Sequence, residues 1–457
     1  MTLKFLTNTL CTTVFATATL ATAQAQTVPG EYLVKLKKQS KSMFLSTLAD
    51  DLAGAELEVV APEQNIVLVK ADAAKISNGD VVERLLARRD VEHIQPNYRY
   101  RILLHVPQKT KTAAIELPMP RLFSEPGNME AETAGADPLL KRDHDIDLAN
   151  ARKAWKVTRG KRDVVVAVID SGVDYKHEDL AANMWHDPNN SSIVGWDFIE
   201  KDNDPNDILG DGNPGHGTHC AGNVGAVGQN GIGTSGIAQK VSIMALRSLD
   251  ENGAGETSAG LQAIDWAVDH GANIISASWG SEGLADEDQL MKEAIMRAQE
   301  KGVLFVAAAG NTSSRNPKDA DNDNNPNART YPASFDLPNI ISVAASNQKG
   351  ELANFSHFGA TTVHMAAPGE RSFSTVPGES KYQDVAEMDG EKISWNGTSM
   401  ATPQVAGAAA LLLSKNRKWD YVELKKRLLE TVRPEPTLKG KTISGGVLDV
   451  TQALKGL

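Results

Sequence analysis

Cysteine is nearly absent from this chain. Only two of its 457 residues are cysteines, Cys11 and Cys220. If residues 1–25 are removed on export, no pair remains to form an intramolecular disulfide, so a fold held together by disulfides is excluded. Two cysteines are also too few for a zinc site built from several thiolates.

A surplus of basic charge is missing as well. The chain has 47 Lys and Arg against 58 Asp and Glu, which gives a net charge of −11. Nucleic acids and anionic membranes are bound by basic surfaces, so we expect neither as a partner. Past the N-terminus no apolar run reaches membrane length, and we expect a soluble mature protein. Hydrophobic residues make up 41%, enough for the cores of two or three domains.

Residues 1–25 have the pattern of an export signal. Lys4 precedes a moderately apolar stretch over residues 5–21, and Ala23-Gln24-Ala25 matches the small-residue pattern of a cleavage site. The stretch is too short and too polar for a durable transmembrane helix. We therefore predict a signal peptide cut after Ala25 and a secreted protein. A membrane-anchored N-terminus is the alternative.

Residues 26–105 read as a small α+β unit. Alternating and helical patterns predict the order strand, helix, strand, strand, helix, strand, which is that of a ferredoxin-like unit. Residues 106–136 contain four prolines and no sustained period, which is typical of a linker. The predicted strands cover residues 31–37, 56–60, 66–69 and 91–94, and the predicted helices cover residues 41–52 and 81–89.

Residues 137–457 have a different pattern. Continuous apolar runs alternate with helical stretches, which predicts a doubly wound α/β fold with a mostly parallel sheet. In such sheets the site lies at the carboxyl ends of the strands. The predicted strands cover residues 164–169, 241–246, 272–277, 303–308 and 340–345, and helices are expected at 258–268, 286–301 and 401–413.

Four residues sit where acyl-transfer chemistry needs them. A serine hydroxyl is a weak nucleophile, so it needs an imidazole to take its proton and an acid to fix the imidazole tautomer. Asp170 ends a predicted strand, His216 opens a helix, and Ser399 precedes a helix of small residues. Asn311 ends another predicted strand and, with the backbone N–H of Ser399, could stabilise an oxyanion.

These motifs, in this order, resemble those of the subtilisin-family serine proteases, or subtilases, over residues 137–457. The resemblance implies a triad of Asp170, His216 and Ser399, an oxyanion donor in Asn311, and no cofactor for catalysis. It also implies two walls for the primary specificity pocket, Ser278-Trp279-Gly280 and Ala308-Ala309-Gly310. The motifs are Val168-Ile169-Asp170-Ser171-Gly172-Val173-Asp174, Gly215-His216-Gly217-Thr218-His219-Cys220-Ala221-Gly222, Val306-Ala307-Ala308-Ala309-Gly310-Asn311 and Asn396-Gly397-Thr398-Ser399-Met400-Ala401-Thr402-Pro403.

The N-terminal unit resembles the inhibitor-type propeptide of the same family. The likeness rests on Val28-Pro29-Gly30-Glu31-Tyr32-Leu33-Val34-Lys35 at its start and Val91-Glu92-His93-Ile94-Gln95-Pro96-Asn97-Tyr98 at its end. It implies an intramolecular inhibitor that is cut off somewhere between Tyr100 and Ala136. An unrelated accessory domain is the alternative.

Calcium is the metal that the resemblance implies. Calcium prefers several oxygen ligands from carboxylates, amides and backbone carbonyls. The carried-over set is Asp137, Asp179 and Asn230 by their side chains and Val227, Ile232 and Thr234 by their carbonyls. Two further acidic groups are either calcium sites or solvated loops: Asp202, Asp204 and Asp207, and Asp319, Asp321 and Asp323.

We predict a secreted, monomeric serine endopeptidase made as an autoinhibited zymogen, with protein or peptide substrates. A pocket walled by Gly and Ala backbone favours apolar or aromatic side chains and broad specificity. Ser171 after Asp170, and Ser281-Glu282-Gly283, depart from the kexin-like pattern, so strict dibasic processing is not expected. A binding protein on a subtilase scaffold and a processing enzyme with one partner are the alternatives. Cys220 is expected to be a small buried hydrophobe rather than a second nucleophile.

Overall fold

This computed structural model describes residues 27–37, 51, 52, 54–72, 74–106, 136–283, 288–314, 316–388 and 390–457. The predicted signal peptide, most of the predicted helix at 41–52, and the predicted linker apart from its two ends lie outside the described residues. None of the described helices combines the length and the apolar character that crossing a membrane requires.

The N-terminal unit is an antiparallel sheet with one described helix of full length, α3 (Asn78–Leu86). The side chain of Ser77 caps α3, and the helix buries Val81 and Leu85. All four predicted strands and the second predicted helix are confirmed. The strands lie in the order β4 (Val91–Ile102), β1 (Thr27–Leu36), β3 (Ile66–Lys70) and β2 (Glu56–Ala61).

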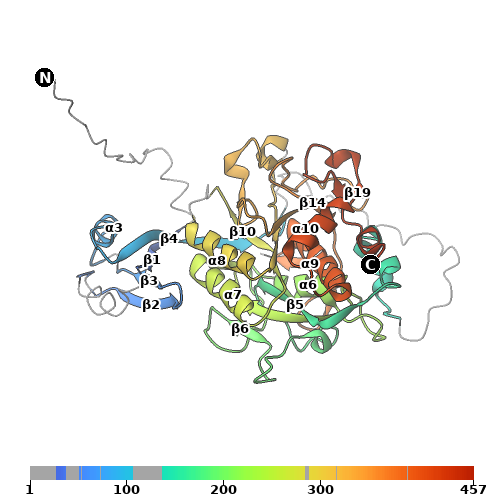
Figure 1. Cartoon of the computed structure of the whole chain (residues 1–457), viewed down its shortest axis with the longest axis horizontal. Coiled ribbons are helices and arrows are strands. Elements are labelled where there is room, and N and C mark those ends of the chain that lie inside the picture. The colour runs from blue at the N-terminus through green and yellow to red at the C-terminus, as the bar shows by residue number, and fades with distance from the viewer. Residues whose placement is uncertain are drawn as a thin grey trace.

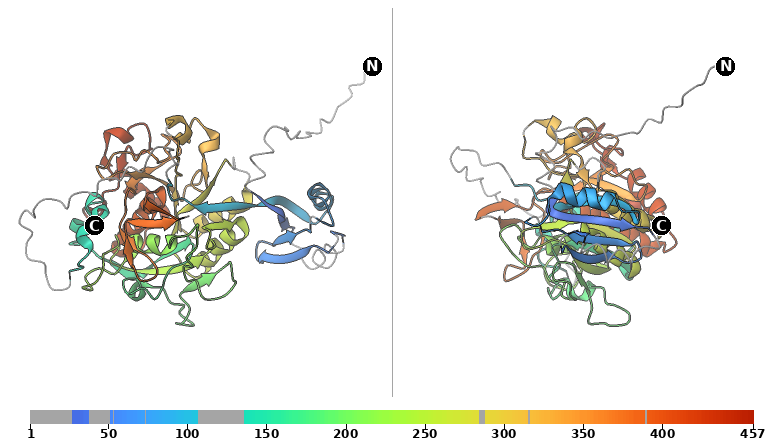
Figure 2. Two further views of the ribbon diagram at one scale, coloured as in Figure 1. Left: turned by 180° about the vertical axis from the view of Figure 1, so that it is seen from behind. Right: turned by 90° about the vertical axis from the view of Figure 1, so that its left-hand side faces the viewer.

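Strand β4 is much longer than predicted, because it continues to Ile102 instead of ending at Ile94. Its last residues pair antiparallel with β8 (Ala254–Glu256) and with β10 (Trp279–Glu282). These partners lie far along the sequence, so no local pattern predicts that β4 continues past Ile94. Strand β4 therefore belongs to both units, as Figure 1 and the left view of Figure 2 show.

The C-terminal unit is built on a nine-stranded sheet, and all five predicted strands are confirmed in it. They are apolar strands that pair in parallel. The sequence missed the other four strands of this sheet, which have two to four residues each. The order is β19 (Arg433–Pro434), β20 (Gly446–Val447), β14 (Met365–Pro368), β13 (Ile340–Ser346), β11 (Leu304–Ala308), β9 (Ile274–Ala277), β5 (Gly160–Asp170), β7 (Lys240–Arg247) and β6 (Gly195–Asp197).

Helices cover both faces of this sheet, as a doubly wound fold requires (Figure 1). One face packs against α6 (His216–Gly225) and α9 (Thr398–Lys415), and the small side chains of α9 let it lie buried over almost its whole length. The other face packs against α7 (Thr257–Asp269) and α8 (Gln289–Glu300). The apolar core on that second face also includes Tyr98 and Tyr100 of β4, so the two units share a core.

The remaining described elements are short. The helices are α4 (His144–Leu148), α5 (Ala151–Ala154), α10 (Tyr421–Glu430) and α11 (Val450–Leu454). The strands are β12 (Thr330–Tyr331), β15 (Ser374–Thr375), β16 (Tyr382–Gln383), β17 (Val385–Met388) and β18 (Glu391–Ser394). The 3₁₀ turns are η2 (Leu140–Arg142), η3 (Ala181–Asn183), η4 (Pro317–Ala320), η5 (Pro326–Ala328) and η6 (Pro436–Leu438).

Candidate active site

Three of the predicted residues meet at the carboxyl edge of the sheet. Asp170 is the last residue of β5, His216 the first residue of α6, and Ser399 the second residue of α9, and all three are fully buried. A side chain at Gly217 would meet the Gly172 carbonyl at 2.0 Å. Helix α6 can therefore approach the end of β5 this closely only because glycine follows His216.

The acid and the imidazole form a buried hydrogen-bonded pair. Nδ1 of His216 lies 2.7 Å from Oδ1 of Asp170, which also accepts the Ser171 N–H at 2.8 Å. Burial alone would lower the pKa of His216, but the Asp170 carboxylate outweighs it, so the pKa lies well above the ordinary value of histidine. The other ring nitrogen, Nε2, has no hydrogen-bond partner within the described chain.

The Ser399 hydroxyl does not bond to this imidazole in the structure. Its Oγ donates to the Ser278 carbonyl oxygen at 2.8 Å, and the Ser278 hydroxyl donates back to the Ser399 carbonyl at 2.8 Å. Ser399 must therefore rotate about its Cα–Cβ bond before Nε2 of His216 can take its proton.

The end of the N-terminal unit occupies the cleft beside these groups. The Leu103 carbonyl accepts a hydrogen bond from Nδ2 of Asn311, and the Leu103 N–H donates to Ser278 O at 3.3 Å. Asn311 is held in place because its Oδ1 accepts the Thr398 N–H at 3.0 Å. Past this point the His105 N–H donates to the Asn396 carbonyl at 2.7 Å. Hydrogen bonds thus hold the chain on both sides of the peptide bond between Leu103 and Leu104.

The lack of a side chain at Gly397 makes this close approach possible. A Cβ at that position would lie 2.5 Å from the Leu103 carbonyl oxygen and 3.3 Å from Nδ2 of Asn311. Both contacts are shorter than van der Waals distance, so Gly397 leaves the space in which the carbonyl and its donor meet. The glycine before Thr398-Ser399 is therefore part of the carbonyl-binding geometry, which the sequence alone did not reveal.

The first predicted pocket wall contacts two residues of the N-terminal unit, and the second predicted wall is buried. A side chain at Gly280 would meet Cδ1 of Leu103 at 3.3 Å, so this wall does face the residue before the bond. The Trp279 ring instead packs edge-to-face on Tyr100, with centroids 5.1 Å apart. The second wall, Ala308 to Gly310, is buried beside Thr330 and His357.

Glu282 was used in the sequence analysis only against the kexin-like pattern, and not as a pocket residue. It lines a cavity of about 350 Å³ together with Asn311 and His357. Its side chain is 47% exposed, and its Oε1 lies 3.8 Å from Nε2 of His357. The signal that could have found it is its place two residues after Gly280 in β10.

A second buried acid organises the loops that carry the triad. Asp207 accepts hydrogen bonds from Ser171 Oγ at 2.9 Å, from Asn213 Nδ2 at 2.8 Å and from both the N–H and the hydroxyl of Thr218. Burial raises its pKa to about 6. These four hydrogen bonds tie Asp207 to the segments around Asp170 and His216, and among the described residues Asp202, Asp204 and Asp207 do not form a cluster of possible metal ligands.

The residues beside His216 on α6 are packed structurally, as predicted. His219 stacks on Trp395 with ring centroids 4.0 Å apart, and burial lowers its pKa to about 3, so it stays neutral. Cys220 is buried, and its sulfur lies 3.9 Å from Nδ1 of His216. It therefore contacts the Asp170 side of the ring rather than the Nε2 side.

The loop expected to hold calcium does bring its side chains together. Nδ2 of Asn230 lies 2.7 Å from Oδ1 of Asp179, and Asp137 accepts the N–H groups of Gln229 and Asn230. Burial raises the pKa of Asp179 to about 7, and the neighbouring Asp137 carboxylate adds to this. The Asp137 and Asp179 carboxylates are therefore close enough to interact, as two oxygen ligands of one divalent cation would be.

The backbone of this loop wraps around Asp179. The Thr234 N–H donates to Asp179 Oδ2 at 3.0 Å, the Val227 N–H donates to the Asp179 carbonyl at 2.8 Å, and the Ile232 N–H donates to Asn230 Oδ1 at 3.0 Å. All six residues of the expected set thus belong to one local structure.

The acidic loop at 318–327 differs. Its three aspartates bind separate neighbours: Asp319 accepts from Ser314, Asp321 from Asn324, and Asp323 from Thr361 and Thr362. The three side chains therefore do not converge on one point.

Comparison with known proteins agrees with this geometry. The profile of the Subtilase family matches residues 161–446. The chain belongs to the subtilase family. It is 32% identical over 409 residues to a thermophilic serine proteinase of Bacillus sp. (strain AK1), covering 88% of this chain and 82% of that protein. It is 39% identical over 267 residues to thermitase of Thermoactinomyces vulgaris, covering 58% of this chain and 80% of thermitase.

A solved structure extends the likeness to most of this subtilase. Fervidolysin from Fervidobacterium pennivorans, described as a keratinolytic enzyme related to subtilisin, shares 25% identity and a TM-score of 0.72. The match covers 94% of this chain and 62% of the fervidolysin chain. The fold is thus subtilisin-like, and the protein is a subtilisin-type serine protease, a serine-type endopeptidase that acts on protein or peptide substrates.

Proposed function

We propose that this subtilase is made as an autoinhibited precursor that cuts its own chain between Leu103 and Leu104. The observation that carries the proposal is the hydrogen bond from Nδ2 of Asn311 to the Leu103 carbonyl. This bond supports the Leu103 carbonyl as the one on which negative charge would develop. The propeptide then comprises residues 26–103, and the mature enzyme begins at Leu104 unless later cuts shorten it.

In the first half of the reaction, Ser399 attacks the Leu103 carbonyl carbon and His216 Nε2 takes the hydroxyl proton. Asp170 holds Nδ1–H and stabilises the imidazolium. The carbonyl oxygen becomes an oxyanion, which Asn311 Nδ2 and the Ser399 N–H stabilise. The C–N bond to Leu104 then breaks as His216 returns the proton to the leaving amine.

In the second half, water hydrolyses the acyl-enzyme. His216 removes a proton from the water, the hydroxide attacks the ester carbon, and the proton passes to Ser399 Oγ as the ester bond breaks. The products are a Leu103 carboxylate and a new amine at Leu104. Peptide substrates would be hydrolysed by the same steps.

After the cut, the N-terminal unit would remain bound as an inhibitor, because its contacts with the C-terminal unit do not depend on the broken bond. Asn97 donates to Glu256 Oε2 at 2.8 Å and accepts the Ser258 N–H at 3.1 Å at the start of α7. Lys35 lies 3.1 Å from the Glu293 carboxylate on α8. These contacts support a propeptide rather than an unrelated accessory domain.

We propose broad specificity for the residue before the cut, with apolar side chains favoured. Leu103 lies against Gly280, and the opposite wall from Ala308 to Gly310 carries no large side chain. A peptide library should show cleavage after several apolar residues. A strict requirement for paired basic residues would contradict this.

We propose structural calcium at the loop around Asp179, held by the side chains of Asp137, Asp179 and Asn230. The backbone carbonyls of Val227, Ile232 and Thr234 would complete the set. When bound, the ion would neutralise two carboxylates and brace the loop. A chelator should lower the melting temperature, since a ligand at about a hundred times its Kd adds about 2.7 kcal/mol. An unchanged melting temperature would exclude calcium there.

Export and a monomeric state complete the proposal. The pattern of residues 1–25 supports export, with Ala25 as the last residue removed. The protein should be found in the medium of expressing cells, and light scattering should give the mass of one chain. Retention in the cell or a dimer mass would contradict these two points.

The deciding experiment compares the wild type with Ser399→Ala by intact mass over time. The wild type should separate between Leu103 and Leu104, and the variant should stay whole. Ser414→Ala, a buried serine on the same helix, is the matched control and should be cut like the wild type. Cutting of both Ser399 forms at the same bond would assign the cleavage to another protease.

A further inference from the structure

Tyr100, the fourth residue before the proposed cut, fills a pocket of its own. Its side chain is 1% exposed and packs edge-to-face on Trp279. Met291 of α8 belongs to the same apolar core. A side chain at Gly260 of α7 would meet Met291 and Trp279, so a glycine there leaves room for these two side chains.

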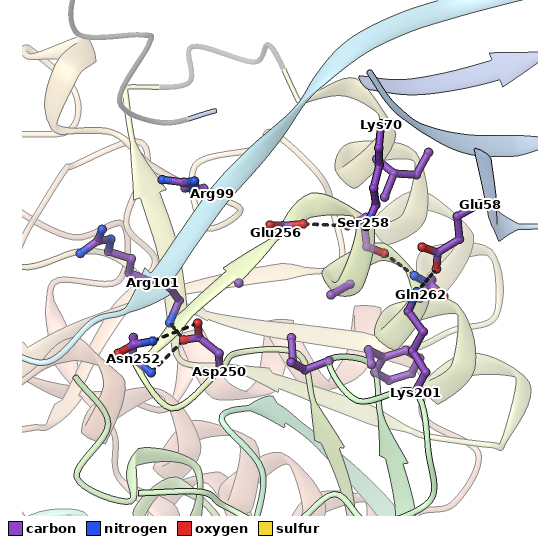
Figure 3. A pocket seen from close by; sticks show the side chains of 16 residues that line it. Glu58, Lys70, Arg99, Arg101, Lys201, Asp250, Asn252, Glu256, Ser258 and Gln262 are labelled. Atoms are coloured by element: carbon purple, nitrogen blue, oxygen red, sulfur yellow. Dashed lines mark hydrogen bonds and ion pairs between the residues drawn. The ribbon is translucent and has the colours of Figure 1, made fainter. Parts of the chain in front are cut away.

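The neighbours of Tyr100 on the strand face the other way. Arg99 and Arg101 are exposed and line a cavity of about 440 Å³ with Asp250 and Glu256 (Figure 3). Alternation along a strand explains this difference. The pocket therefore holds the side chain of one residue of the bound segment, Tyr100, and not those of its two neighbours.

The far end of this pocket is a carboxylate. Tyr100 OH donates to Oδ2 of Asp288 at 2.7 Å, and Asp288 is fully buried. Two further hydrogen bonds come from the C-terminal unit, from Thr257 Oγ1 at 2.5 Å and from the Met291 N–H at 3.1 Å, and the latter makes Asp288 the cap of α8. Gln95 of the N-terminal unit supplies a fourth at 2.7 Å.

When the N-terminal unit leaves, Asp288 loses the two donors that Tyr100 and Gln95 provided. The bonds from Thr257 and Met291 belong to the mature enzyme and keep the carboxylate in place. A substrate that enters the cleft then desolvates this carboxylate again. A buried acceptor without a donor costs free energy, and the cost is greater for a charged group.

We propose that Asp288 is a specificity-determining residue that selects tyrosine as the fourth residue before the scissile bond. The inference rests on the proposed function in one respect: Tyr100 is the fourth residue only when positions are counted back from the Leu103–Leu104 bond. The aromatic wall favours a ring, and the carboxylate at its far end favours a ring that carries a hydroxyl donor. Phenylalanine would fill the same space but supply no hydrogen bond to Oδ2 of Asp288, so the buried carboxylate would keep only the donors Thr257 and Met291. Sites built around such a bond discriminate strongly against the analogue that lacks it.

The test uses the processed enzyme and blocked peptides that span residues 98–106. One peptide has the natural sequence, and others carry Tyr100→Phe or Tyr100→Lys. The wild type should hydrolyse the tyrosine peptide with a kcat/KM about tenfold to a hundredfold higher than the phenylalanine peptide. Mass spectrometry identifies the bond that is cut.

The variant Asp288→Ser should bring the tyrosine-to-phenylalanine ratio close to one. Serine still caps a helix but is too short to reach the phenol, so α8 should be retained. The ratio is taken within each enzyme, so a partial loss of folded protein cancels. Asp420→Ser, which changes the cap of α10 instead, is the matched control and should keep the wild-type ratio.

Three outcomes would overturn the proposal. They are equal rates for tyrosine and phenylalanine in the wild type, a higher rate for the lysine peptide, and an unchanged ratio in Asp288→Ser. If no peptide were hydrolysed at all, the proposed reaction at the Leu103–Leu104 bond would fail, which is a distinguishable result.

Discussion

The chain is held very differently on the two sides of the bond between Leu103 and Leu104. Upstream, β4 pairs with β8 and β10, and its side chains enter pockets that contain Asp288 and Trp279. Downstream, within residues 104–106, the structure shows the bond from His105 to Asn396, the stacking of His105 on Phe355 and the packing of Leu104 against the core.

This difference suggests which fragment stays after the cut. Before cleavage both sides are held intramolecularly, at high effective concentration. After cleavage each side keeps only its own contacts. The upstream side retains strand pairing and a shared core, whereas the described downstream side retains one backbone hydrogen bond and two side-chain contacts. The propeptide should therefore stay bound as an inhibitor while the new N-terminus leaves the cleft.

The largest effect should come from Asp170→Asn. This variant should slow the cleavage itself and so keep the two sides of the Leu103–Leu104 bond joined. The amide leaves the geometry nearly intact but favours the wrong imidazole tautomer, which lowers kcat about ten thousand-fold in the trypsin-like enzymes where it was established. Self-cleavage followed by intact mass should slow by a similar factor. A loss of less than about tenfold would show that His216 works without this acid.

The pH profile gives an independent check on the same pair. His216 must be neutral to accept a proton, and Asp170 raises its pKa well above the ordinary value. Activity should therefore fall as pH is lowered through that raised pKa, above about 6.5. In Asp170→Asn the raising charge is gone, so the acid limb of kcat/KM should move to lower pH. Coincident limbs in the two enzymes would contradict this assignment.

The next largest effect should come from Asn311→Leu, which acts at the carbonyl between the two sides. Loss of one oxyanion donor lowers kcat about a hundredfold to a thousandfold, a magnitude taken from a subtilisin and thus from this family. KM should change little, because the bond strengthens mainly in the transition state. A raised KM at constant kcat would instead make Asn311 a binding residue.

Asn97→Ala should weaken only the binding of the upstream segment, the propeptide, to the C-terminal unit. Asn97 bonds Glu256 and Ser258 across the two units, so its loss should speed release of the cut propeptide about tenfold. The measurement is the rate at which activity appears after self-cleavage. Asn78→Ala, on α3 at the far end of the N-terminal unit (Figure 1), is the control and should release at the wild-type rate. Equal rates for all three proteins would mean that the described contacts do not hold the inhibitor.

The sequence predicted the apolar strands and the helix starts at the proposed triad because their signals are local. The apolar run before Asp170 and the glycines around His216 indicate a buried strand and a tight helix start. The sequence could not single out the proposed cut after Leu103, because the strands and the Asn311 side chain that contact Leu103 come from distant parts of the chain. For the same reason Asp288 was missed, and Asp207 was assigned to a calcium site or a solvated loop: a buried acid is distinguished from a solvated one only by the neighbours that folding brings to it.

The smallest effect should come from His105→Ala, which weakens the downstream side. His105 stacks on Phe355 with ring centroids 4.8 Å apart, and such a contact contributes about 0.5–1.5 kcal/mol. The backbone bond from residue 105 to Asn396 remains, so self-cleavage should slow by no more than about tenfold. Release of the propeptide after the cut should be unchanged, because residue 105 then belongs to the mature enzyme, whose new N-terminus has left the cleft. Slower cleavage together with faster release would show that the two sides are coupled, and the asymmetry between them would then be an incomplete account of how the precursor is held.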